Sequence, residues 1–134
     1  MENKYEFKEF LDLKHRYFIL VPKDEGALDE LYEGQFYDDD NNCVKEHYLH
    51  MEFDEKAFLL LEEYLFNFID AKCDLIITMY EEEWAEPEKL GDILMLTDSM
   101  IGNCDNERFI ELANRFRKLV IAAQSLNMPV VFYF

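Results

Sequence analysis

The chain has 134 residues, of which 50% are hydrophobic and 16% aromatic; this suffices for the core of one domain, and the length excludes two. Its 30 acidic residues outnumber 13 basic residues, which gives a formal net charge of −17. Such a charge disfavours direct binding to nucleic acid and speeds encounters with cationic proteins. We therefore expect a single domain over residues 1–134 with a basic protein as its partner.

Targeting and redox signals point to the cytoplasm. The chain has no apolar run of 18 residues, and its N-terminal segment MENKYEFKEF lacks the cationic start and apolar core of a signal peptide. The three cysteines, Cys43, Cys73 and Cys104, are far apart and form no CxxC pair, which is typical of reduced thiols. The sequence predicts a cytoplasmic protein that neither spans a membrane nor is exported.

The first third of the chain predicts a helix, a strand and a second helix. Apolar residues at helical spacing favour a helix over residues 3–13, and the run YFILVP predicts a buried strand over residues 17–22. Asp24 is placed to cap a short helix over residues 25–33, which Gly34 would end.

The middle of the chain predicts a turn, a strand and a long helix. The letters DDDNN indicate a turn, and alternating apolar residues favour a strand over residues 49–53. Asp54 then opens a helix to residue 71. Leu59 and Phe66 lie outside its apolar stripe, so this helix is buried on more than one side or covered by a partner. The stripe consists of Ala57, Phe58, Leu61, Tyr64, Leu65 and Phe68.

The continuous apolar run DLIITMY predicts a strand over residues 74–80 that is covered on both faces. Pro87 suits the first turn of a helix over residues 87–101, whose inward residues would be Leu90, Leu94 and Ile101; a strand over residues 93–97 is the alternative.

The last helix is the clearest in the sequence. Asp105 is placed to cap it, Glu111 and Arg115 are spaced to pair on its outer face, and Asn127 and Pro129 end it before a terminal strand, VVFYF. Its apolar stripe consists of Phe109, Leu112, Ala113, Phe116, Leu119, Val120 and Ala123.

The order of these elements predicts an α/β fold with a small, largely parallel sheet of three to four strands covered by helices. A strand, two helices and a returning strand favour a right-handed crossover, which would make the strands over residues 74–80 and 130–134 parallel. The carboxyl ends of parallel strands form a binding edge. That edge would carry residues 23–26, residues 80–86 and Phe134.

This element order, over roughly residues 17–134, resembles the barstar family of barnase inhibitors. The tyrosine, glycine, asparagine and tryptophan signature around the second helix of that family is replaced here by HMEFDEKAFLLLEEYL, so no inhibitory residue is carried over. The resemblance implies a small acidic ribonuclease inhibitor that protects a cell from a toxin.

The segment YEEEWAEPEKL holds the first candidate site, because it places five glutamates around the only tryptophan of the chain. Interface energy concentrates in aromatic residues, and flanking charges speed docking onto a basic surface. The alternative is a solvated loop before a helix N-terminus, with the indole folded into the core. The candidate partner-binding residues are Tyr80, Glu81, Glu82, Glu83, Trp84 and Glu86.

A second acidic zone runs from Asp24 to Asp40 and includes the aromatic residues Tyr32 and Phe36. A line of carboxylates can occupy the lysines and arginines with which a nuclease holds a phosphate backbone. The alternative is a charge run that only keeps the protein soluble. The candidate partner-binding residues are Tyr37, Asp38, Asp39 and Asp40.

The sequence predicts no metal or cofactor site and no enzyme. The run from Asp38 to Asn42 begins like a calcium loop but lacks its glycine and its terminal glutamate. Cys43, His47 and His50 lack a fourth zinc ligand, and a strand would point the two histidines to opposite faces. Motifs of hydrolases, P-loop proteins and dinucleotide-binding proteins are absent from the sequence.

The leading hypothesis is a non-enzymatic inhibitor of the immunity or antitoxin type, which binds a basic bacterial toxin, with a nuclease as the expected class, and occludes its substrate cleft. One alternative is an acidic mimic of nucleic acid, encoded by a phage, that blocks a host defence enzyme such as a CRISPR nuclease. Another is a small α/β enzyme or ligand-binding module. The terminal strand leaves a homodimer possible if it lies at a sheet edge.

Overall fold

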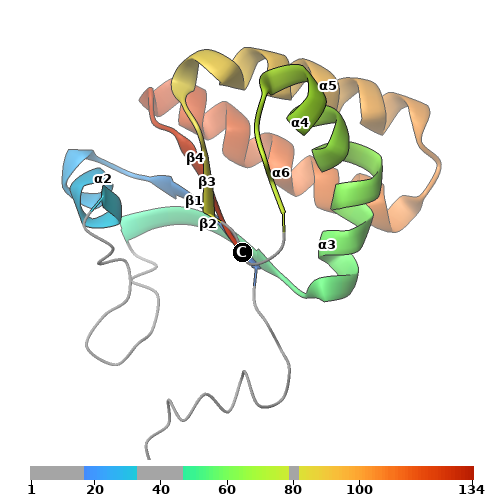
Figure 1. Cartoon of the computed structure of the whole chain (residues 1–134), viewed down its shortest axis with the longest axis horizontal. Coiled ribbons are helices and arrows are strands. Elements are labelled where there is room, and N and C mark those ends of the chain that lie inside the picture. The colour runs from blue at the N-terminus through green and yellow to red at the C-terminus, as the bar shows by residue number, and fades with distance from the viewer. Residues whose placement is uncertain (1–16, 33–46, 79–81) are drawn as a thin grey trace, which may run out of the picture.

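The computed structural model describes residues 17–32, 47–78 and 82–134 (Figure 1). The strands are β1 (Tyr17–Pro22), β2 (Tyr48–Phe53), β3 (Glu82–Ala85) and β4 (Val130–Tyr133). The helices are α2 (Glu25–Tyr32), α3 (Glu55–Leu61), α4 (Asn67–Cys73), α5 (Leu90–Asn103) and α6 (Glu107–Leu126). A π-helical turn, η2 (Glu62–Phe66), joins α3 to α4, and a 3-10 turn, η3 (Pro87–Lys89), precedes α5. The helix expected over residues 3–13 and the DDDNN turn lie outside the described residues.

The four strands form one antiparallel sheet in the order β2-β1-β4-β3. The prediction of a largely parallel sheet is therefore wrong, although the α/β class and the number of strands are right. The reason lies in the two helices between β3 and β4. A single crossover helix returns the chain to its starting end and gives parallel strands. The hairpin of α5 and α6 reverses the chain once more, so β4 enters from the opposite end and runs antiparallel to β3 (Figure 1).

The strand predicted over residues 74–80 is also wrong for its described part, residues 74–78, which form no strand. Leu75 and Ile77 are buried, but Ile76 is 68% exposed. The backbone N–H groups of Ile76 and Ile77 donate to the side chains of Glu83 and Asp70. Residues 74–78 therefore pack beside β3 without joining the sheet, and we call them the covering segment. The strand that pairs with β4 lies further along, at Glu82–Ala85.

The sheet has a large core on one face and a small one on the other. Figure 1 shows α3 to α6 on one side of the sheet and α2 on the other. Alternating residues of the central strands separate the two cores: Ile19 and Phe132 face the large core, whereas Leu20 and Val131 face α2. The C-terminal Phe134 lies in the large core, against Tyr17 and Phe58, so its expected place on a binding edge is wrong.

The helix that begins after Asp54 confirms its predicted cap and corrects its predicted face. Asp54 Oδ1 accepts the N–H of Ala57 at 2.9 Å. The π-helical turn then adds a residue to one turn, which rotates the following side chains relative to a regular α-helix. Phe66 is fully buried as a result, and Phe68 is 47% exposed.

The last two helices form where the sequence predicts them, although α5 buries Ile93 and Thr97 beside Leu90 and leaves Leu94 and Ile101 half-buried. Residues 93–97 lie within α5, so the alternative of a strand there is wrong. All seven predicted stripe residues of α6 are buried. Its N-cap is Asn106, one residue beyond the expected Asp105, and Asn127 ends it in the left-handed conformation with φ 56°. Glu111 pairs with Arg108, three residues before it, so the predicted pair with Arg115 is wrong. Within the described residues, no helix is both long and apolar enough to cross a membrane.

Candidate functional site

The glutamate and tryptophan segment forms the edge strand β3, where Glu82 and Trp84 point to the face covered by α2 and Glu83 and Ala85 to the other. Trp84 lies opposite Val131 on β4 and packs against the small core. Trp84 is half-buried, so its indole is not folded fully into the core, as one of the two alternatives expected.

The exposed part of the indole is extended by Tyr32, the last residue of α2. The two rings are stacked, with centroids 5.0 Å apart and planes inclined by 13°. Tyr32 is 64% exposed, and the indole Nε1 of Trp84 donates to Glu82 Oε2 at 2.5 Å. Two aromatic rings and a carboxylate therefore form one continuous surface at the edge of the sheet.

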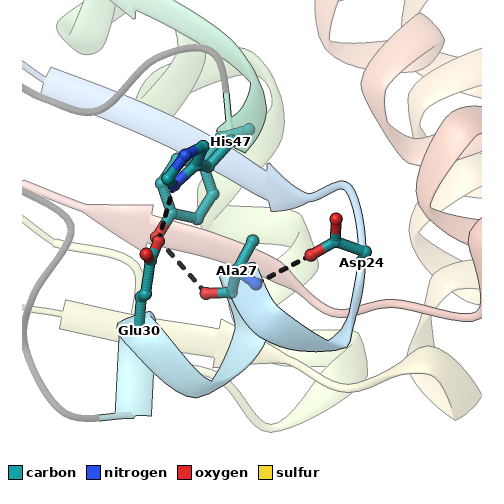
Figure 2. Close-up of polar contacts among 5 residues, drawn as sticks. Asp24, Ala27, Glu30 and His47 are labelled. Atoms are coloured by element: carbon teal, nitrogen blue, oxygen red, sulfur yellow. Dashed lines mark hydrogen bonds and ion pairs between the residues drawn. The ribbon is translucent and has the colours of Figure 1, made fainter.

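The position of α2 decides where Tyr32 lies, and polar contacts fix it (Figure 2). Asp24 Oδ1 accepts the N–H of Ala27 at 2.9 Å and so caps the first turn. Glu30 Oε1 contacts His47 Nδ1 at 2.8 Å, just before β2. The hydroxyl of Tyr48 lies within hydrogen-bond distance of Ala27 O (3.3 Å) and Glu30 Oε1 (3.2 Å). These contacts hold α2 against the sheet at its buried Ala27.

The remaining acidic residues of α2 face outward. Glu25 and Asp29 precede Tyr32 by seven and three residues, which places all three on one face of the helix. Both are exposed, and neither forms an ion pair within the described part of the chain. We define the acidic aromatic stripe as Glu25, Asp29, Tyr32, Trp84 and Glu82. The stripe thus combines residues of the acidic zone that begins at Asp24 with residues of the glutamate and tryptophan segment.

Glu83 serves the fold rather than this surface. Its carboxylate accepts the N–H groups of Ile76 (2.8 Å) and Trp84 (3.0 Å). Nearby, Asp70 Oδ1 accepts the N–H of Ile77 at 3.0 Å. Burial raises the pKa of Asp70, the backbone hydrogen bond from Ile77 lowers it, and the negative charges of Glu83 and Glu62 raise it further. The two carboxylates thus anchor the covering segment beside β3.

Tyr133 lies beside the stripe. It is paired with Glu82 across the two strands and is half-buried. Burial raises the pKa of its phenol, and the adjacent charge of Glu82 raises it further, so the ring remains neutral.

The other predicted site residues divide into two groups. Glu86 is half-buried and precedes the 3-10 turn, where its carbonyl accepts the N–H of Lys89 at 2.9 Å. Six residues lie outside the described part of the chain: Tyr37, Asp38, Asp39, Asp40, Tyr80 and Glu81.

Sequence reasoning named Tyr32 only as part of an acidic zone and missed Tyr133. The alternation in VVFYF could have shown that Tyr133 points away from the large core. No sequence signal could have placed Tyr32 on Trp84, because that contact depends on which strand lies beside β4.

Comparison with known protein families, with curated proteins and with solved structures finds no match to this chain. The resemblance to the barstar family stays a prediction. Within residues 17–32, 47–78 and 82–134, no group of three or more His, Cys, Asp or Glu residues could hold a metal ion. Of the residues considered for metals, His47 pairs with Glu30, and Cys43 and Asp38 to Asn42 lie outside those ranges.

Proposed function

We propose that this protein is a non-enzymatic inhibitor that binds a basic protein through the acidic aromatic stripe, with a nuclease toxin as the expected partner. The observation that carries the proposal is the exposed Tyr32 ring stacked on the only tryptophan, whose indole N–H donates to the carboxylate of Glu82, with Asp29 exposed three residues before Tyr32 on the same helix. Isolated exposed aromatics are common, but a stacked pair beside unneutralised carboxylates suits a cationic side chain.

An arginine of the partner is the best match to this chemistry. Its planar guanidinium can stack on the face of Tyr32 or Trp84 while its N–H groups donate to a neighbouring carboxylate. The net charge of −17 would attract a basic surface over a longer range and speed the encounter. Arginine and lysine residues that hold a nucleic-acid backbone would then be covered by the stripe.

The test starts with capture of partners from the cell that encodes the chain, with the wild-type protein and with Tyr32→Ala, followed by binding kinetics. We expect Tyr32→Ala to release the captured partner at least about tenfold faster, the size of effect typical of an interface hot spot. Glu82→Gln should mainly slow association. Matched controls are Met95→Ala and Glu63→Gln, exposed residues on α5 and η2, on the other side of the sheet.

Salt dependence and selectivity separate this proposal from the alternatives. Association with the captured protein should slow by about tenfold or more as salt rises from about 50 to 500 mM, because screening shortens the range of the attraction. An association rate indifferent to salt would contradict the proposal. A mimic of nucleic acid predicts instead that Tyr32→Ala changes little and that several DNA-binding proteins are inhibited.

A further inference from the structure

A shallow groove runs along the opposite edge of the sheet, between β2 and α6, and encloses about 500 Å³. Its surface is mostly apolar, and the basic residues of α6 lie on its rim. The lining residues are Leu49, His50, Met51 and Glu52 from β2, and Arg115, Lys118, Leu119 and Ala122 from α6.

Backbone groups of β2 face this groove. Lys23 N donates to His47 O at 3.1 Å, in the same antiparallel register as the β1 and β2 pairs. Antiparallel pairs alternate between hydrogen-bonded and non-bonded, so Leu49 and Met51 bond to β1. The N–H and C=O of His50, which lies between them opposite Leu20, therefore point away from β1.

The two edges of the sheet differ in what contacts their outward-facing backbone groups. At β3, the same alternation turns the N–H of Trp84 outward, and the carboxylate of Glu83 accepts it. A side chain of the protein itself thus occupies that edge. At β2, the outward backbone of His50 opens instead onto the groove beside α6. Among the described residues, the edge at β2 offers an outward backbone at His50 that no side chain occupies, together with an adjoining apolar wall.

The basic side chains of α6 differ in whether they form ion pairs. Arg108 and Arg117 form ion pairs with Glu111 and Asp98. The side chains of Arg115 and Lys118, which line the groove, form no ion pair with any residue in the described ranges. These two cations outnumber Glu52, the one carboxylate among the described residues that line the groove, in a chain with more than two acidic residues for each basic one, which favours an anionic group as the ligand.

We propose that this groove binds an extended segment of a partner protein by strand addition to β2, with two carboxylates of that segment facing Arg115 and Lys118. Alternate residues of a strand lie about 6.6 Å apart on one face, and residues three apart on a helix have Cβ atoms about 5–6 Å apart. Carboxylates at positions i and i+2 therefore match the two cations. Apolar residues at i+4 and i+6 would follow along the wall formed by Leu119 and Ala122.

The probe is a fluorescent peptide, Thr-Glu-Thr-Glu-Thr-Leu-Thr-Val, whose two carboxylates and two apolar side chains share one face. Its binding is measured by fluorescence anisotropy at about 150 mM salt, where screening beyond about 8 Å limits repulsion by distant carboxylates of the protein. The control peptide has the same composition with adjacent glutamates, which places them on opposite faces of a strand. We expect the control to bind at least about tenfold more weakly.

His50→Pro tests the backbone contact without breaking the sheet. Proline removes the outward N–H of residue 50, which β1 does not use, and edge strands tolerate proline there. We expect at least about tenfold weaker binding of the peptide with an unchanged circular dichroism spectrum. Arg115→Glu with Lys118→Glu should weaken binding as strongly, whereas Lys56→Glu with Lys72→Glu, an equal charge change at exposed lysines outside the groove, should not.

Three results would overturn the proposal. One is failure of the peptide to bind at millimolar concentration, and another is binding that survives His50→Pro. The third is concentration-dependent dimerisation in analytical ultracentrifugation that His50→Pro abolishes, because a second copy of the chain would then occupy the edge. None of these results bears on the acidic aromatic stripe, which lies on α2 and at the β3 edge, whereas the groove lies between β2 and α6.

Discussion

The contact between Tyr32 and Trp84 makes a prediction whose size can be worked out from the structure. Tyr32 is 64% exposed, so about a third of its surface is buried. A fully buried aromatic side chain covers about 150–250 Å², which leaves roughly 50–90 Å² here, or about 1–2 kcal/mol at about 25 cal/mol per Å². The stacked geometry, with centroids 5.0 Å apart, adds about 0.5–1.5 kcal/mol.

A double-mutant cycle isolates the second contribution. Tyr32→Ala, Trp84→Ala and the double variant are unfolded in urea and followed by far-UV circular dichroism, because Trp84→Ala removes the only tryptophan. We expect Tyr32→Ala to lower the free energy of unfolding by about 2–3 kcal/mol, against about 0.5 kcal/mol or less for an ordinary surface change. The coupling energy between the two positions should be about 0.5–1.5 kcal/mol.

Tryptophan fluorescence gives an independent measurement. In the Tyr32→Ala variant, Trp84 loses the ring that covers one face, so its emission should shift to longer wavelength. A coupling energy below about 0.3 kcal/mol, the error of additivity, together with unshifted emission would refute the stacked contact. The flat surface on which the proposed function depends would then be lost.

Three further predictions concern the fold. Phe66→Ala should lower the free energy of unfolding by about 3–5 kcal/mol, and Phe68→Ala should lower it by less than about 1 kcal/mol. The reason is that the π-helical turn buries Phe66 and leaves Phe68 exposed. Equal losses in urea unfolding would contradict the presence of that turn. In the same assay, Asn106→Ala should lower the free energy of unfolding by about 1 kcal/mol and Asp105→Ala by at most about 0.5 kcal/mol. The reason is that Asn106 is the residue whose side chain accepts the first-turn N–H of α6. A larger loss for Asp105→Ala would show that Asp105 is the N-cap. Asp70 binds its proton more tightly in the folded than in the unfolded state, so its contribution to stability falls as pH rises above its ordinary pKa of 3.8. Asp70→Asn keeps the acceptor oxygen and should unfold at higher urea concentration than the wild type at pH 7, a difference that should shrink at acid pH; a destabilised variant at pH 7 would show that the charge itself is needed.

Strands β1 and β4 and helix α6 were predictable because their signals are local. A helix with apolar residues at three- and four-residue spacing must bury one face whatever it packs against, and all seven stripe residues of α6 do so. Asp54 and Asn127 likewise act on their own backbone neighbours, as cap and as left-handed terminus.

The candidate site was predictable in composition but not in shape. The clustered glutamates predicted an acidic surface around Trp84, and Glu82 and Trp84 face the same side of the sheet; the basic partner stays a prediction. The different roles of Glu82 and Glu83 could not be predicted, because the two residues are adjacent and chemically identical. Strand alternation sends one to the covering segment and the other to the indole.

The sequence by itself determined where helices and most strands form and that the surface would be strongly acidic, since periodicity and charge are properties of neighbouring residues. Only the tertiary structure decided that residues 82–85, rather than the more apolar run before them, pair with β4 in antiparallel register. The backbone N–H groups of a short apolar run can form their hydrogen bonds either with a neighbouring strand or with carboxylates such as those of Asp70 and Glu83. Which of the two occurs depends on groups distant in sequence, and that choice also places Tyr32 on Trp84.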